Sequence, residues 1–216
     1  MKVYLEVGGK KTFASAVDWP GWSRGGRTED EALDSLLDYA KRYARAVATP
    51  VAELGPLTRG SDEIVERLKG NATTDFGAPG AVPELDRAPI TEKRLDELIA
   101  LLRAAWATFD KVAARARGKD LGPSGPRGGG RTLDKMVAHV LDAQAGYLGA
   151  VGGKTSGDAS WADLKREFEK ALGQRARGEL PDVGPRGGKR WPAPYAIRRA
   201  AWHALDHAWE IEDRLG

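Results

Sequence analysis

The chain contains no cysteine, and this single absence removes several classes of chemistry. Disulfide bonds, zinc–thiolate clusters and thiol nucleophiles all require cysteine sulfur, so none of them contributes here. Long apolar runs are also missing, because no stretch approaches the roughly 20 residues that a membrane-spanning helix needs. Residues 1–6 lack the apolar core of a secretory signal. We therefore expect a cytoplasmic protein without a membrane span.

A strong excess of one charge is absent as well. The chain has 34 Lys and Arg against 31 Asp and Glu, a formal net charge of +3, and the two signs are interspersed. Such a distribution gives no extended cationic surface, so nucleic acid is not an expected partner. With 216 residues, 41% hydrophobic and 30% charged, the chain is typical of a soluble protein with one large or two small domains. A small-molecule substrate is the expected partner, and a homodimer is compatible with the sequence.

The N-terminal residues 1–83 have the pattern of a small α+β domain. Apolar and polar residues alternate over 3–17 around a Gly-Gly pair, which predicts a two-stranded hairpin. Thr28 and Glu31 have the spacing of a capping box, and apolar residues then recur at helical intervals as far as Val47. We further predict a helix over 62–69 and an additional strand over 72–76.

Proline and glycine are concentrated in residues 77–89, and we place the domain boundary there. Beyond it, every periodic segment is helical, and Gly/Pro-rich loops over 118–130 and 178–194 separate the later ones. The predicted helices span 91–117, 132–151, 160–177 and 193–215. The sequence thus predicts an α+β protein: a small N-terminal sheet and helix unit in 1–83, followed by an antiparallel four-helix bundle in 89–216.

The chain has only three histidines, and all of them fall within predicted bundle helices. His203 and His207 are four residues apart, so they project from one helix face a single turn apart. His139 lies beside the apolar stripe of the second long helix. Three imidazoles suit a divalent transition metal and leave coordination positions for water or a substrate. The alternative is that these are ordinary histidines satisfied by hydrogen bonds.

Charged residues near the histidines suggest supporting roles. Glu210 shares the helix face of the histidine pair and is our candidate for a fourth ligand or a catalytic general base. Asp142 and Asp206 are close enough along their helices to orient a histidine. Arg199 and Arg214 flank the pair and could hold an anionic substrate, although an arginine in the last turn, such as Arg214, also complements the helix dipole.

The sequence around the histidines resembles the DinB superfamily. The resemblance rests on residues 131–139 (RTLDKMVAH), on Gln144 and Tyr147, and on residues 202–214 (WHALDHAWEIEDR), and it extends over about 91–216. It implies a four-helix bundle with a metal-binding triad formed by His139, His203 and His207.

The DinB resemblance also implies an activity. Several members use low-molecular-weight thiols such as mycothiol or bacillithiol in transferase or isomerase reactions. We expect zinc, with nickel as the second choice, and a metal-bound thiol or water as the reactive group of a transferase, isomerase or hydrolase. The absence of cysteine fits a thiol that arrives as a cosubstrate.

The N-terminal domain resembles the HicB-like fold through residues 18–22 (DWPGW) and 28–32 (TEDEA). HicB proteins act as antitoxins, but the sequence that follows here has the pattern of a metal-binding bundle rather than of a DNA-binding module, so we do not carry that role over. The alternative to an enzyme is a non-catalytic module that binds a protein partner through the N-terminal domain, at an exposed sheet edge.

Overall fold

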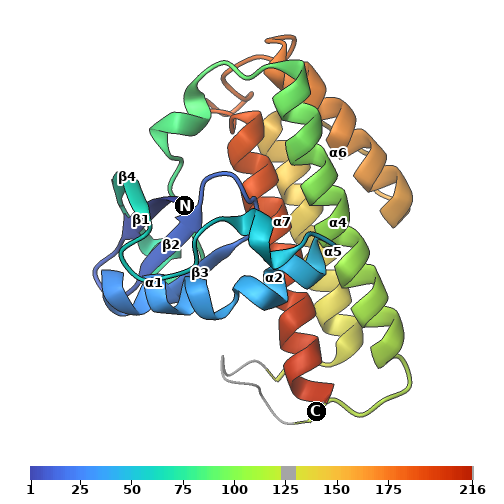
Figure 1. The fold of residues 1–216 in the computed structure, drawn as a ribbon. Coiled ribbons are helices and arrows are strands. Elements are labelled where there is room, and N and C mark those ends of the chain that lie inside the picture. The colour runs from blue at the N-terminus through green and yellow to red at the C-terminus, as the bar shows by residue number, and fades with distance from the viewer. Residues whose placement is uncertain (123–129, 216) are drawn as a thin grey trace. The chain divides into compact units, whose positions relative to one another are not determined.

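The computed structural model describes residues 1–122 and 130–215 of the chain. These residues divide into two compact units, Met1–Ala88 and Pro89–Gly216. A mixed four-stranded sheet lies near the N-terminus, and helices make up most of the remaining regular structure (Figure 1). The α+β fold class is therefore confirmed.

The N-terminal sheet has the strand order β3-β2-β1-β4. Its strands are β1 (Lys2–Val7), β2 (Thr12–Ala16), β3 (Ser23–Gly26) and β4 (Glu63–Lys69). The predicted hairpin is confirmed, because β1 and β2 pair antiparallel from Val3↔Ala16 to Val7↔Thr12. β3 adds antiparallel to β2, and β4 adds parallel to β1.

Two predictions for this unit are wrong. Residues 62–69 do not form a helix, because β1 offers an open edge and the segment pairs along it as β4. Residues 72–76 do not form a strand but the short helix α3 (Ala72–Phe76). Asn71 caps this helix in a reciprocal capping box with Thr74, and Gly77 ends it at a φ of 119°.

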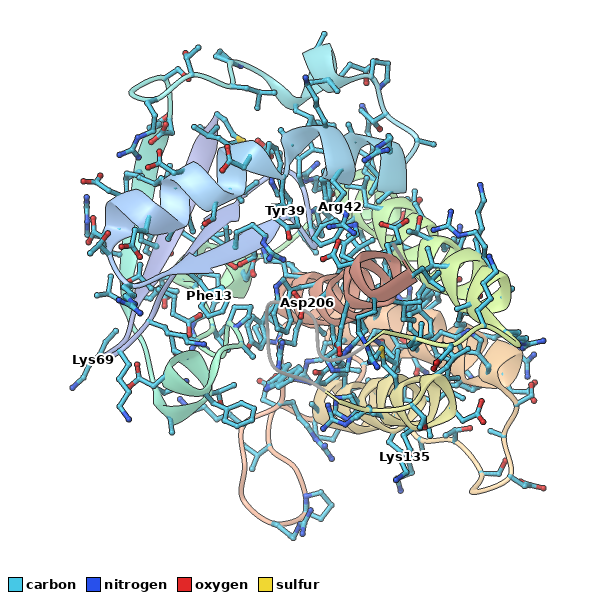
Figure 2. The ribbon with its side chains drawn as sticks, turned by 90° about the horizontal axis from the view of Figure 1, so that it is seen from below. Phe13, Tyr39, Arg42, Lys69, Lys135 and Asp206 are labelled. Atoms are coloured by element: carbon cyan, nitrogen blue, oxygen red, sulfur yellow. The ribbon has the colours of Figure 1, made fainter. Side chains whose placement is uncertain are left out.

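The single helix expected after Thr28 is divided in two. α1 (Glu29–Asp38) begins as predicted, with the Thr28 hydroxyl accepting from the Glu31 N–H at 3.1 Å. It ends at Tyr39, whose N–H bonds back to the carbonyls of the preceding turn, and α2 (Ala40–Ala46) follows. The guanidinium of Arg24 lies 3.8 Å from the centre of the Tyr39 ring, and that of Arg42 lies 5.6 Å from it (Figure 2). Two short 3-10 helices, η1 (Val51–Leu54) and η2 (Glu84–Arg87), complete the unit.

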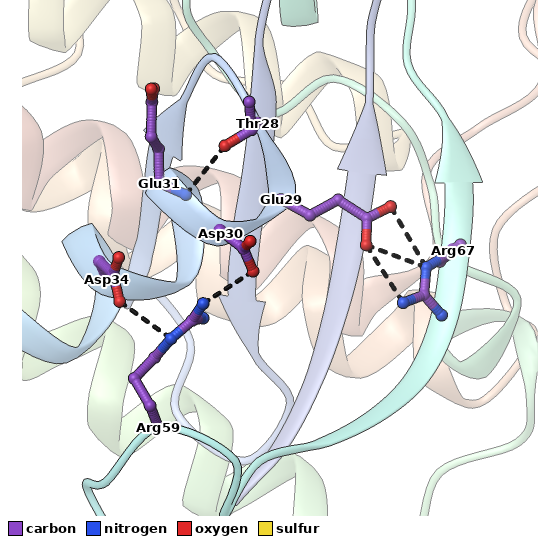
Figure 3. Close-up of polar contacts among 7 residues, drawn as sticks. All are labelled: Thr28, Glu29, Asp30, Glu31, Asp34, Arg59 and Arg67. Carbon is purple, nitrogen blue, oxygen red and sulfur yellow. Dashed lines mark hydrogen bonds and ion pairs between the residues drawn. The ribbon is translucent and has the colours of Figure 1, made fainter.

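Exposed ion pairs connect the acidic start of α1 to the segment around β4 (Figure 3). Arg67 of β4 pairs with Glu29 at 3.1 Å, and Arg59 pairs with Asp30 at 2.7 Å and with Asp34 at 3.0 Å. Pairs in this position are screened by solvent, so they align α1 more than they stabilise it.

The Trp-Pro-Gly-Trp motif of residues 19–22 contributes to the core of the unit. The Trp22 ring stacks on the Tyr43 ring with centroids 5.3 Å apart, and its indole N–H donates to the Leu36 carbonyl at 2.8 Å. The Tyr43 hydroxyl donates to the Pro20 carbonyl at 2.9 Å. The aromatic residue and the proline of this motif therefore fasten α1 and α2 to the turn before β3.

The C-terminal unit contains four long helices that pack on one another. They are α4 (Glu92–Ala116), α5 (Leu133–Val151), α6 (Trp161–Ala176) and α7 (Ala193–Leu215). The four helix predictions are confirmed to within a residue or two at their ends, and the first three helices begin at the hydroxyl caps Thr91, Thr132 and Ser160. The loop predicted over 118–130 lies partly outside the described residues. No helix in the described part of the chain has both the length and the apolar character needed to cross a bilayer.

Contacts along the helices give their directions. α5 runs antiparallel to α7, because Gln144 bonds to the Ala200 carbonyl at 3.1 Å and the Ala150 carbonyl accepts from the Trp191 N–H at 2.9 Å. α4 and α7 instead run in the same direction (Figure 1). Trp106 lies level with Ala200 through Gln144, and Arg115 pairs with Glu212 at 3.6 Å.

α6 runs antiparallel to α4. Arg103 pairs with Glu169 at 2.6 Å, and further along α4 Asp110 pairs with Lys165 at 2.9 Å. α4 and α7 therefore share one direction and α5 and α6 the other, so successive helices do not simply alternate.

Candidate metal centre

The antiparallel contact between α5 and α7 brings the three histidines together. α7 is alanine-rich and buried over most of its length, which places His203 and His207 inside the unit at 6% and 8% exposure. His139 projects from α5 and is half-buried. One ring nitrogen from each histidine lies within 4.8 Å of the others. The three predicted ligands thus form one cluster.

Gln144 sets the register that makes this cluster. Its side chain is fully buried, accepts from the Trp106 indole N–H at 3.3 Å and donates to the Ala200 carbonyl at 3.1 Å. These bonds fix α5 against α7 less than two turns from His139 on one helix and about one turn from His203 on the other. A buried amide with both ends bonded allows only one register.

The distance between His139 and His203 fits shared coordination. Their Nε2 atoms lie 3.2 Å apart. Two nitrogen ligands of a tetrahedral zinc ion, each at about 2.0–2.1 Å, would be separated by roughly 3.3 Å. The three rings stand at steep angles to one another, with centroids 4.7 to 5.1 Å apart. Ring nitrogens therefore converge while the rings avoid stacking.

Burial favours the neutral form of two of the three imidazoles, the form that metal ligation requires. It lowers the pKa of His203 to about 2, with His207 and Arg199 adding smaller effects in the same direction. It also lowers the pKa of His139. Among the described residues, the buried Nδ1 of His203 has no hydrogen-bond partner. Each neutral imidazole has one unprotonated ring nitrogen, and such nitrogens are the donor set expected for a divalent transition metal.

Glu210 contacts the cluster through His207. Its Oε2 lies 2.8 Å from Nδ1 of His207, which places the ring proton on Nδ1 and leaves Nε2 free to bind a metal. Its other oxygen lies 3.9 Å from buried Arg214, which also donates to the carbonyls of Gly122 and Arg131. This contact gives Glu210 an orienting position, and its role as a fourth ligand or general base stays a prediction.

The sequence also suggests that Asp142 and Asp206 orient a histidine. Asp142 raises the pKa of His139 through its charge, an effect smaller than that of burial. Asp206 immediately precedes His207, and consecutive helical residues point about 100° apart, so it projects from a different face of α7. Glu210, by contrast, lies 2.8 Å from Nδ1 of His207.

An aromatic and cationic group adjoins the cluster, and sequence reasoning identified only part of it. The Tyr147 ring meets the His203 ring edge-on at 5.8 Å. The Arg199 guanidinium lies 5.5 Å from the centre of the Tyr147 ring and 4.6 Å from that of Trp202. The four-residue spacing of Arg199 and His203 was visible in the sequence, but the contribution of Tyr147 depends on how α5 packs on α7.

Comparisons of the chain with protein-family models, with curated proteins and with solved structures found no match.

Proposed function

We propose that residues 89–216 form a four-helix bundle of the DinB type that binds one divalent transition metal through His139, His203 and His207. The observation that carries this proposal is the convergence of three imidazole nitrogens within 4.8 Å. Each of α4 to α7 also contacts the other three helices, as a bundle requires. Zinc is the first choice of metal and nickel the second, because both accept imidazole ligands.

The proposed reaction class is the transfer or isomerisation of a small substrate with a low-molecular-weight thiol, of the mycothiol or bacillithiol kind, as cosubstrate. A bound metal would supply Lewis acidity that lowers the pKa of a coordinated thiol or water. The chain has no cysteine, so its own residues supply no thiol. Its histidines provide neutral ligands, Glu210 orients His207, and the buried position of the pair on α7 limits access of bulk water.

Elemental analysis of the full chain, purified without an affinity tag, tests metal binding. We expect about one equivalent of metal in the wild type and a loss of most of it in His203→Gln, since two remaining ligands lose much of the chelate effect. Lys135→Ala is the control, because Lys135 is exposed on α5 one turn before His139 (Figure 2). The proposal is contradicted if the wild type holds negligible metal, or if His203→Gln holds as much metal as Lys135→Ala.

A second measurement separates the enzyme from the alternative binding module. Consumption of a low-molecular-weight thiol in the presence of an electrophile should depend on His203 if the metal centre is catalytic. The protein-binding alternative draws on β4, which lies at a sheet edge with alternate residues exposed. Under that alternative, partner binding should be unchanged in His203→Gln.

A further inference from the structure

In the part of the chain that the structure describes, one arginine beside the histidine cluster, Arg199, has a buried nitrogen without a hydrogen-bond partner. Arg199 is half-buried on α7, one turn before His203. Within residues 1–122 and 130–215, its buried Nη1 atom has no hydrogen-bond partner, and its guanidinium forms no ion pair with a carboxylate. The group lies instead over the rings of Tyr147 and Trp202. Aromatic faces attract a cation but accept none of its N–H donors in the plane of the fork.

Two other arginines of the same unit have guanidinium groups that are bonded to protein oxygens, as expected of arginines with a structural role. Arg214 donates to the carbonyls of Gly122 and Arg131 and lies 3.9 Å from Glu210. Arg175 donates to two carbonyls and pairs with Asp182 at 2.6 Å. In both, nitrogens of the guanidinium meet protein oxygens. Among the residues that the structure describes, none offers an acceptor to the buried Nη1 of Arg199. This arrangement is unfavourable unless a ligand supplies an acceptor.

The position of Arg199 connects this unsatisfied group to the metal centre. Tyr147 contacts both the Arg199 guanidinium, at 5.5 Å, and the His203 ring, at 5.8 Å. The positive charge of Arg199 also lowers the pKa of His203, as expected of a neighbour. A molecule held by Arg199 would therefore lie close to the group that the histidines hold.

We propose that Arg199 binds a carboxylate of the substrate, so that the substrate class is a small carboxylic acid in its ionised form. A guanidinium donates two parallel N–H bonds, which match the two oxygens of a carboxylate. The rings of Tyr147 and Trp202 hold the guanidinium in place and offer apolar surface to the body of the substrate. This assignment of substrate class rests on the proposed function, but carboxylate binding by Arg199 does not itself require a metal.

The test uses the full chain without metal, with benzoate as the probe and benzamide as its uncharged counterpart. Isothermal titration should show that wild type binds benzoate and that Arg199→Gln weakens this binding about tenfold or more, the loss expected when a charge-assisted bidentate pair is removed. Arg166→Gln is the matched control, because Arg166 is an exposed arginine on α6 paired with Asp163. It should bind benzoate as wild type does.

Several outcomes overturn the proposal: no binding of benzoate by wild type, equal binding of benzamide, or equal binding of benzoate by Arg199→Gln. If that variant does not fold, side-chain ¹⁵N spectra of wild type labelled at arginine replace it, and an Arg199 resonance unmoved by benzoate has the same meaning. The metal content of Arg199→Gln is measured in parallel. A protein that binds benzoate through Arg199 but holds no metal would contradict the proposed function while leaving this site in place.

Discussion

His203 is the residue whose protonation most directly opposes the folded state. Burial lowers its pKa to about 2, whereas in the unfolded chain it has the ordinary value of 6.5. Above the unfolded value both states carry a neutral ring, so pH has no effect through this residue. Below it the unfolded chain binds a proton that the folded chain excludes, and the free energy of unfolding falls as the pH drops from 6.5 toward 2.

This linkage gives a prediction for the metal-free protein. Urea unfolding at about pH 8 and about pH 5 should show a loss of stability on acidification, and His203→Gln, which has no titrating ring, should show a smaller loss. His139, whose pKa burial also lowers, adds to the effect in both proteins. An equal loss of stability in wild type and variant would mean that His203 is accessible to protons in the folded state.

Glu210 gives a second prediction at the scale of single residues. Its carboxylate holds the Nδ1–H of His207, and loss of such a partner typically weakens metal binding by about 10- to 100-fold. We expect Glu210→Ala to show a decrease of this size in competition with a chromophoric chelator. Glu210→Gln should fall between Glu210→Ala and wild type, because an amide oxygen still accepts the hydrogen bond.

Asp142→Asn is the comparison for Glu210, because Asp142 acts on His139 through its charge. It should change metal affinity by less than about threefold, in line with a screened charge. If Asp142→Asn weakens binding as much as Glu210→Ala, the contact with His207 is not what supports the site.

The sequence predicts which residues form this cluster better than it predicts which of their atoms make contact. The four-residue spacing of His203 and His207 follows from helical geometry alone, and the position of Glu210 on the same face follows with it. Glu210 contacts the Nδ1 atom of His207, and the choice of this nitrogen depends on a side-chain rotamer that the sequence does not specify. That the buried Nη1 of Arg199 has no acceptor among the described residues depends on which side chains pack around it, and no local sequence pattern contains that information.

At the scale of elements, α5 and α7 depend on Gln144 for their register. Replacing Gln144 with Leu keeps the volume but leaves the Trp106 indole N–H and the Ala200 carbonyl without their partner. We expect a loss of about 1–3 kcal/mol in the free energy of unfolding, the usual effect of leaving buried polar groups unsatisfied. We also expect weaker metal binding, because the register places His139 opposite the histidine pair.

Gln174→Leu is the matched control for Gln144, since Gln174 is a half-buried glutamine on α6. It should alter stability by no more than about 0.5 kcal/mol, as is common for sites away from buried polar networks. Chemical denaturation and metal titration of both variants make the comparison. An unchanged metal affinity in Gln144→Leu would show that the helices keep their register without this amide.

The elements that sequence analysis assigned wrongly are those decided by distant pairing. Residues 63–69 became β4 because the open edge of β1 lies alongside them, more than fifty residues away in the chain. α3 was missed for a local reason: the reciprocal cap between Asn71 and Thr74 outweighs the β-prone composition of residues 72–76. The long helices were predicted because hydroxyl caps and apolar periodicity agreed over many turns.

At the scale of the whole molecule, helix limits and helix directions differ in how far the sequence determines them. Hydroxyl caps mark where α4, α5 and α6 begin. The direction of a helix depends on the length of the loop that precedes it. The loops before α6 and α7 are long enough for each helix to run parallel or antiparallel to the one before it. The shared direction of α4 and α7 becomes visible only through tertiary contacts such as that between Arg115 and Glu212.

Metal binding should stabilise the two compact units unequally, because every proposed ligand belongs to residues 89–216. A ligand that binds only the folded state adds about 2.7 kcal/mol when its free concentration is about 100 times Kd. Hydrogen exchange of the full chain with and without zinc reports this gain locally. Amides of α5 and α7 should exchange more slowly with zinc, and those of β1 to β4 should change little. In His203→Gln the zinc-dependent protection of α5 and α7 should disappear, and protection that persists in this variant would place zinc at other residues than the histidine cluster.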